Sequence, residues 1–319
     1  MAEFRTYTAI GQREDLSNTI FNIAPTETPV VSSIGKTKAT ATYHEWQTDD
    51  LAAASAAGLI EGADASGASD TPTTRVGNRT QIQGKTVHVS GTLDAVDKAG
   101  RKTETAYQLA KAGQELKRDM EKTILGNVAQ NAGAAGTARL LGSIQSWLGT
   151  NFVTMTDGVA PVGSNGTAAR TEGATASAFT EAKLKEVVKS CFENGGNPTL
   201  LVVPPTQKQV VSTFAGIAEQ RYQAPAAKAT TIIGAADVYL SDFGTLSVVP
   251  DRFMTADTTP DAEQALVLDP TMASVATLRP FESNLLAKTG DSEKHQMLVE
   301  YTLQVSNEKA HGIVADLAV

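Results

Sequence analysis

The spacing of apolar residues predicts two helices that each present one apolar face. In the segment Thr103–Val128, apolar residues recur at intervals of three and four positions over Leu109–Ile124, which is the period of one face of a long helix. A second stripe with this period covers Leu184–Phe192, and Thr180 precedes it as a candidate N-cap. We therefore expect a long helix and, after a stretch rich in Gly, Ala, Thr and Asn, a shorter one.

Further along, the pattern changes to short apolar runs and to alternation, which are typical of strands. Leu200–Val203 is a short buried run, and Pro204-Pro205 then opens another helix. In Met297–Val305 the apolar side chains alternate with polar ones and share one face. Further strands are predicted at Val238–Leu240, Leu246–Val249, Ala265–Leu268 and Val275–Leu278. The order predicts an α+β chain with a compact α/β unit over residues 135–240.

Two alternating runs near the beginning of the chain, Ala39–Thr48 and Gln81–Gly91, predict half-buried strands. The long connection between them is rich in Ala, Gly, Ser, Asp and Thr, and such a connection is uncommon inside a compact domain. An isolated two-stranded ribbon is at best marginal in water. We therefore predict that the two runs pair into an arm, with His44 opposite His88, and that packing on a neighbouring copy orders this arm.

The segment before the arm, residues 1–38, is expected to be extended, with one short helix around Leu16–Ile23 that Pro25 and Pro29 end. Its first residues have no apolar signal-peptide core, and no apolar run in the sequence has the length of a membrane span. The expectation is a cytosolic product with no encoded export route.

Composition narrows the function classes. The 319 residues are 41% hydrophobic and 19% charged, which is an ordinary globular balance, and the net charge is −8. A protein that grips phosphates needs a basic stripe, and none is visible. Tight, sequence-independent DNA binding is therefore not expected. The one cysteine, Cys191, excludes an intramolecular disulfide and lies in an apolar helical stripe, as a buried structural thiol does.

No motif with catalytic chemistry survives inspection of its context. Gly84-Lys85-Thr86 resembles the end of a phosphate-binding loop, but a strand follows where a helix is required. Asp242-Phe243-Gly244 is better explained as a turn between two strands. The four histidines are scattered and lack the spacing of zinc ligands. We expect no enzyme activity, no cofactor and no metal.

Short segments spread along the chain are informative when they are taken together as a series. The segments are Arg13-Glu-Asp-Leu-Ser with Pro25-Thr-Glu-Thr-Pro29, Tyr43-His-Glu-Trp-Gln-Thr48, Val89-Ser-Gly-Thr92 with Ala95-Val-Asp-Lys-Ala-Gly-Arg101, Glu115-Leu-Lys-Arg-Asp119, Glu193-Asn-Gly-Gly-Asn-Pro198, Ser241-Asp-Phe-Gly-Thr245, Leu278-Arg-Pro-Phe281 with Leu286-Ala-Lys-Thr-Gly-Asp291, and Glu300-Tyr-Thr-Leu303 with Asn307-Glu-Lys-Ala-His-Gly312. This series resembles the major capsid proteins of tailed phages, a family with the Hong Kong 97-type capsid fold. The resemblance spans nearly the whole chain and is specific as a series.

The resemblance implies a division into five parts. These are an N-terminal arm (1–38), an extended hairpin loop (39–93), a spine helix with the first part of the peripheral domain (94–134), an axial domain (135–240), and strands that return from the axial to the peripheral domain (241–319). It also implies a shell of hexamers and pentamers in a virion, assembled in the host cytoplasm. Scaffolding, decoration and portal proteins are implied as partners, with packaged DNA nearby but not specifically bound.

Residues for contacts between subunits are predicted from their type and position. Trp46 is either an aromatic anchor for a neighbour or a ring buried in its own subunit. Glu45, Arg79 and Lys85 are candidates for salt bridges of the arm. Arg279, Lys288 and Glu293 flank a polar loop that is placed to touch a neighbour. Two alternatives stay open at this point: another virion or surface-layer protein (a decoration or tail component, for example), and an enzyme built on residues 135–240.

Overall fold

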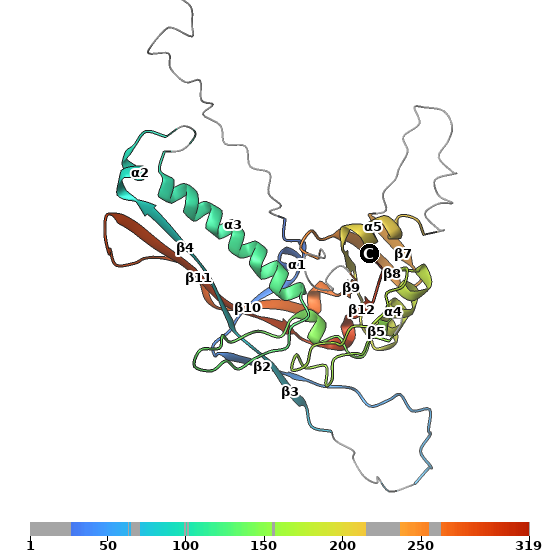
Figure 1. Cartoon of the computed structure of the whole chain (residues 1–319). Helices are drawn as coiled ribbons and strands as arrows, with labels where there is room; N and C mark the ends of the chain where they lie inside the picture. The colour runs from blue at the N-terminus through green and yellow to red at the C-terminus, as the bar shows by residue number, and fades with distance from the viewer. Residues whose placement is uncertain are drawn as a thin grey trace, which may run out of the picture.

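Two β-sheets and one long helix make up the body of the protein (Figure 1). The computed structural model describes residues 27–62, 64, 71–98, 100, 102–154, 157–214, 237–254 and 263–318. The helix predicted around Leu16–Ile23 lies outside these ranges. Among the described residues, no helix combines the length and the apolar character that crossing a bilayer requires.

The first sheet has four strands in the order β1 (Gly35–Lys38), β10 (Ala273–Leu285), β11 (Ser292–Val305) and β4 (Gln81–Ser90). β1 runs parallel to β10, and the other two pairs are antiparallel. Helix α3 (Glu104–Leu125) lies along β4 and β11 (Figure 1). It confirms the long predicted helix, because the apolar face is the buried one: Ala112, Leu116, Met120 and Ile124.

The second sheet has six strands in the order β5 (Phe152–Thr154), β12 (Gly312–Ala315), β9 (Ala265–Leu268), β6 (Leu200–Val203), β8 (Gly244–Pro250) and β7 (Val238–Ser241). Alternate residues of β6 point to opposite faces. Leu201 and Val203 join the core beneath α4 (Glu181–Glu193) and α5 (Pro205–Val211), whereas Leu200 and Val202 join the core shared with α3 and the first sheet. The sheet therefore has a core on each face, as its continuous apolar strands require.

The predicted pairing of the two early strands is wrong. β2 (Tyr43–Thr48) pairs with β3 (Thr74–Arg79), and β4 instead pairs with β11 along ten residues. His44 accordingly lies opposite Asn78, and His88 opposite Lys294. β3 contains Gly77 and Asn78, two residue types that strands disfavour, so its pattern did not indicate a strand. The long half-apolar β11 offers β4 a partner that local sequence cannot reveal.

A short helix, α1 (Pro29–Ser33), precedes β1 and packs on α3. Pro29 begins this helix, whereas the sequence predicted that it would end one. Proline is favoured in the first turn because the N–H it lacks would have no partner within the helix. A second short helix, α2 (Gly91–Ala95), follows β4 directly, and the Ser90 hydroxyl accepts a hydrogen bond from the Leu93 N–H at its start.

Candidate assembly surfaces

The chain leaves the body after β2 and returns at β3 (Figure 1). Between them, residues 51–60 carry no charged side chain and are all exposed. Three large apolar residues in this segment have almost no cover: Leu51 is 99% exposed, Leu59 98% and Ile60 81%. Apolar residues gathered on an exposed segment are typical of a surface that contacts another molecule. We call residues 49–73 the extended loop.

The base of the extended loop is fixed to its own subunit. The Asn78 side chain is fully buried, and its Nδ2 donates to the carbonyl oxygens of Gly142 (2.9 Å) and Leu303 (2.8 Å). The Trp46 ring is half-buried and stacks on the buried ring of Trp147. The predicted ribbon of residues 39–48 and 81–91 was expected to be ordered by a neighbour, and this is wrong for both of its strands, since β2 packs on its own subunit and β4 pairs with β11. The segment beyond Thr48 is the part that its own subunit leaves exposed.

An ion pair secures the point at which the extended loop begins. The Lys309 ammonium lies 2.6 Å from an Asp50 carboxylate oxygen, although the two residues are far apart in sequence. Because Asp50 follows β2 by two residues, this pair defines the direction in which the loop leaves the body.

The predicted arm residues have partners within the chain, but not one another. Glu45 forms a two-point contact with the Arg75 guanidinium at 2.8 and 3.1 Å. The Arg79 guanidinium lies 4.9 Å from the centre of the Tyr43 ring. Lys85 pairs with Asp119 of α3 at 2.9 Å. Sequence reasoning did not single out Arg75 or Asp119, because each lies far along the chain from its partner.

The later group of predicted residues forms two kinds of ion pair, one to a buried carboxylate and one between two exposed side chains. Arg279 Nε donates to Glu300 at 2.7 Å, and the Arg139 guanidinium contacts the same carboxylate. Burial raises the pKa of Glu300, but the Thr80 hydroxyl and the two guanidiniums outweigh it, so that this pKa lies below its ordinary value. Lys288 and Glu293 pair with each other at 3.1 Å, and both side chains remain largely exposed.

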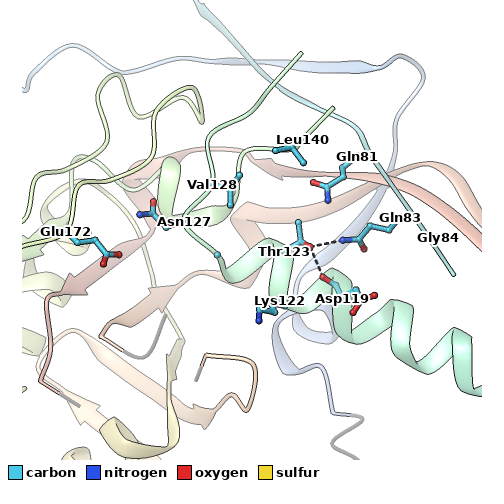
Figure 2. Close-up of a pocket in the computed structure, with 11 residues that line it drawn as sticks. Gln81, Gln83, Gly84, Asp119, Lys122, Thr123, Asn127, Val128, Leu140 and Glu172 are labelled. Carbon is cyan, nitrogen blue, oxygen red and sulfur yellow. Dashed lines mark hydrogen bonds between the residues drawn. The ribbon is translucent and has the colours of Figure 1, made fainter. Parts of the chain in front are cut away.

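A groove of about 720 Å³ runs between β4 and the C-terminal half of α3 (Figure 2). At its centre the Thr123 hydroxyl donates to the Asp119 carbonyl and accepts from Gln83 Nε2, both at 2.7 Å. The Asp119 carboxylate is already paired with Lys85. Among the described residues that line the groove there is no histidine, serine or cysteine.

Two other titratable groups are fixed in the core. Cys191 is fully buried, and burial raises the pKa of its thiol to about 12, as a structural thiol requires. His311 is also fully buried, and burial lowers its pKa to about 4. Its Nδ1 accepts from the Asp269 N–H at 3.1 Å, so the ring is a neutral structural element.

Comparison with known proteins decides the family. Residues 4–318 match the family described as SU10 major capsid protein. The chain belongs to this family of capsid proteins. A curated relative, the major capsid protein of Escherichia phage Phieco32, is 38% identical over 128 residues. That match covers 40% of this chain and 36% of the relative, so the chain spans about a third of the length of the curated relative it matches.

Solved structures of phage capsid chains share their fold with this capsid protein over nearly its whole length. A chain from Gordonia phage Cozz superposes with a TM-score of 0.61 at 14% identity, covering 97% of this chain and 92% of that one. A chain from the capsid of a native GTA particle gives 0.59 at 13% identity, covering 98% and 97%. The fold is therefore the Hong Kong 97-like capsid fold, as the sequence segments predicted.

Proposed function

We propose that this protein forms the icosahedral head shell of a tailed phage, as hexamers and pentamers of one chain around double-stranded DNA. Membership of a capsid protein family and the capsid fold support this function. The observation within the molecule that carries it is the extended loop. A lone subunit leaves Leu51, Leu59 and Ile60 in water, whereas a shell gives each of them a neighbour to pack against.

In this proposal the extended loop lies on the next subunit around the capsomer. In the same proposal, seven residues flank or support the surfaces that face the extended loop of a neighbour. These are Glu45, Trp46, Arg79, Lys85, Arg279, Lys288 and Glu293. Their partners within the chain give each side chain a fixed direction before assembly. Interfaces between permanent neighbours are expected to bury more than roughly 2,000 Å². Closed symmetry then repeats every contact, so that individually weak contacts stabilise the shell.

The net charge of the chain is more typical of a protein that encloses DNA without adhering to it than of a DNA-binding protein. A net charge of −8 limits adhesion to packaged DNA and favours its release. The finer parts of the proposal follow from the shell: location in the virion, assembly in the host cytoplasm, and contact with scaffolding, decoration and portal proteins. The five-part division of the chain and the absence of catalysis belong to the same proposal.

Electron microscopy of the purified chain tests this function. Expressed alone or with a scaffolding protein, it should give closed shells of uniform diameter. A decoration or tail component would give only small oligomers or tubes, and a surface-layer protein would give open sheets. Any of these alternative results would overturn the proposal.

A further inference from the structure

Two buried carboxyl groups meet where three distant parts of the chain come together. Glu121 lies on α3, and Asp251 directly follows β8 of the six-stranded sheet. Both residues are 0% exposed. The third part is α1, which packs on α3 from the N-terminal side. The pair therefore joins the N-terminal segment, the long helix and the six-stranded sheet at one point.

Two hydrogen bonds connect the Glu121 carboxylate to the first turn of α1. Glu121 Oε1 accepts from the Val30 N–H at 2.7 Å, and Oε2 accepts from the Val31 N–H at 2.8 Å. These N–H groups lie in the first turn of α1, where no residue of the helix can accept them, and Thr28 provides no side-chain cap. Glu121 thus caps a helix that lies 90 residues away in the sequence.

The geometry around Asp251 requires a proton between the two carboxyl groups. Asp251 Oδ1 accepts from the Phe253 N–H at 2.7 Å, and its side chain is hydrogen-bonded to Glu121. Oδ2 is buried and has no donor among the described residues if both groups are ionised. Two ionised carboxylates in contact would also repel each other strongly at this buried site. One proton held between them removes the repulsion and supplies the missing donor.

The charged groups on the surrounding elements do not replace that proton. α1 contains no titratable residue. On α3, Lys122 is exposed, and the Arg118 guanidinium lies over the Phe253 ring, 5.6 Å from its centre. Next to Asp251, Arg252 is exposed. Burial, followed by the hydrogen bond from Asp251, raises the pKa of Glu121, and burial raises that of Asp251.

We propose that Glu121 and Asp251 share one proton and act as a proton-dependent lock that holds α1, α3 and the six-stranded sheet together. With the proton in place, the pair carries a single negative charge, and both backbone N–H groups of α1 are bonded. When the proton is lost at alkaline pH, the two carboxylates repel. Glu121 keeps its N–H donors, Asp251 moves away, and the end of β8 separates from the helix. This lock goes beyond the proposed function, because it depends on the fold of one chain.

The direction of the pH dependence follows from proton linkage. The native pair holds a proton that the unfolded chain has already released above its ordinary carboxyl pKa. The stabilisation by the pair is therefore complete only below the ordinary carboxyl pKa of 4.5, declines as the pH rises above it, and is fully lost once the pH has passed the raised native pKa of about 8. Loss of one proton shifts the opening equilibrium by up to about tenfold per pH unit.

Infrared spectroscopy of the full-length protein tests the shared proton directly. The wild type at neutral pH should show the carbonyl band of a buried protonated carboxyl group, and this band should disappear at alkaline pH. The variants Glu121→Gln and Asp251→Asn should lack it, because each replaces the shared proton with an amide N–H. Glu115→Gln, at a half-buried position of the same helix where the carboxylate pairs with Lys111, should keep the band. A wild type without it at neutral pH would overturn the proposal.

Hydrogen exchange at Val30, Val31 and Phe253 tests the lock itself. After correction for the intrinsic pH dependence, wild-type protection should fall by about tenfold or more between about pH 7 and about pH 9.5. Glu121→Gln should hold its protection constant over this range, since the amide of glutamine can donate to Asp251. Asp251→Asn provides a second variant if the first folds poorly. Protection that varies with pH equally in the wild type and both variants would refute the lock.

Discussion

The indole rings of Trp46 and Trp147 stack with their centroids 5.3 Å apart and their planes 29° from parallel. Trp46 belongs to the ribbon that supports the extended loop, whereas Trp147 is 1% exposed and lies in the core shared by the two sheets. The stack therefore transmits the rigidity of the core to the base of the loop. Of the two roles that the sequence left open for Trp46, packing on its own subunit is the one observed.

Replacing Trp46 should loosen the ribbon. Trp46→Ala removes the stack and part of the apolar cover of the core, so we expect the free energy of unfolding to fall by about 2 kcal/mol. Trp46→Phe keeps an aromatic ring at this position and should lose less than about 1 kcal/mol. Urea unfolding of the two variants measures the difference. Equal stabilities of Trp46→Ala and wild type would show that the stack contributes nothing.

The apolar tip of the extended loop should matter for assembly and not for folding. The double variant L59S/I60S alters side chains that have almost no contact in the subunit, so its unfolding free energy should stay within about 0.5 kcal/mol of wild type. The yield of closed shells should fall by about tenfold or more, since each contact is repeated throughout the shell.

A matched control for this variant lies in the same loop. Ala53→Ser introduces the same hydroxyl group without removing a large apolar side chain, and it should assemble as the wild type does. Shell yields are counted by electron microscopy after gradient sedimentation. Full yield from L59S/I60S would mean that the loop tip is not a contact surface.

The two ion pairs of the later strands should differ in their effect on stability. Glu300 is buried between Arg139 and Arg279, so Glu300→Gln leaves two guanidiniums without their carboxylate and should cost about 2 kcal/mol. Because the native pKa of Glu300 is lowered, this contribution is present above its ordinary pKa and is lost as the pH falls through the native value.

Lys288→Gln breaks an exposed pair and serves as the comparison, with an expected change of at most about 0.5 kcal/mol in the subunit. Chemical unfolding at neutral and acid pH separates the two variants. A cost for Glu300→Gln no larger than that for Lys288→Gln would contradict the burial argument.

His311 should make the fold sensitive to acid. Its native pKa of about 4 lies below its ordinary 6.5, so the unfolded chain binds a proton that the native state does not. Stability is complete above pH 6.5 and should fall as the pH approaches 4, by up to about 1.4 kcal/mol per pH unit. The slope of stability against pH should be smaller in His311→Gln, whereas the exposed His88→Gln should keep the wild-type slope. An unchanged slope in His311→Gln would exclude this histidine as the cause.

The spacing of apolar residues was sufficient to predict those helices and strands whose own residues define a buried face. The stripes of α3 and α4 and the apolar run of β6 indicate which side chains are buried, and the structure confirms them except for Phe192, which is 50% exposed. The apolar face of β11 is buried from Val299 onward, but Glu300 and Thr302 of its polar face are buried too. The family was also accessible from short segments spread along the chain. None of these inferences required knowledge of which element lies beside which.

Strands whose residues have a weak or mixed preference for strand structure could not be predicted from the sequence. β3 contains glycine and asparagine, and β1 is short and exposed, so neither shows a strand pattern. β12 became a strand because it inserts between β5 and β9. In each case neighbours from elsewhere in the chain supply the hydrogen bonds that the local pattern does not indicate.

The sequence by itself determined the long helix α3, the helix α4, the apolar strand β6 and the membership of a capsid family, because these follow from periods of 3.6 and 2 residues and from short segments spread along the chain. The tertiary structure alone decided that β4 pairs with β11, that Trp46 meets Trp147, and that Glu121 meets Asp251. Closing a long stretch of chain costs only slightly more entropy than closing a short one, so distant partners compete with near ones on almost equal terms. Packing of the whole chain then selects among them.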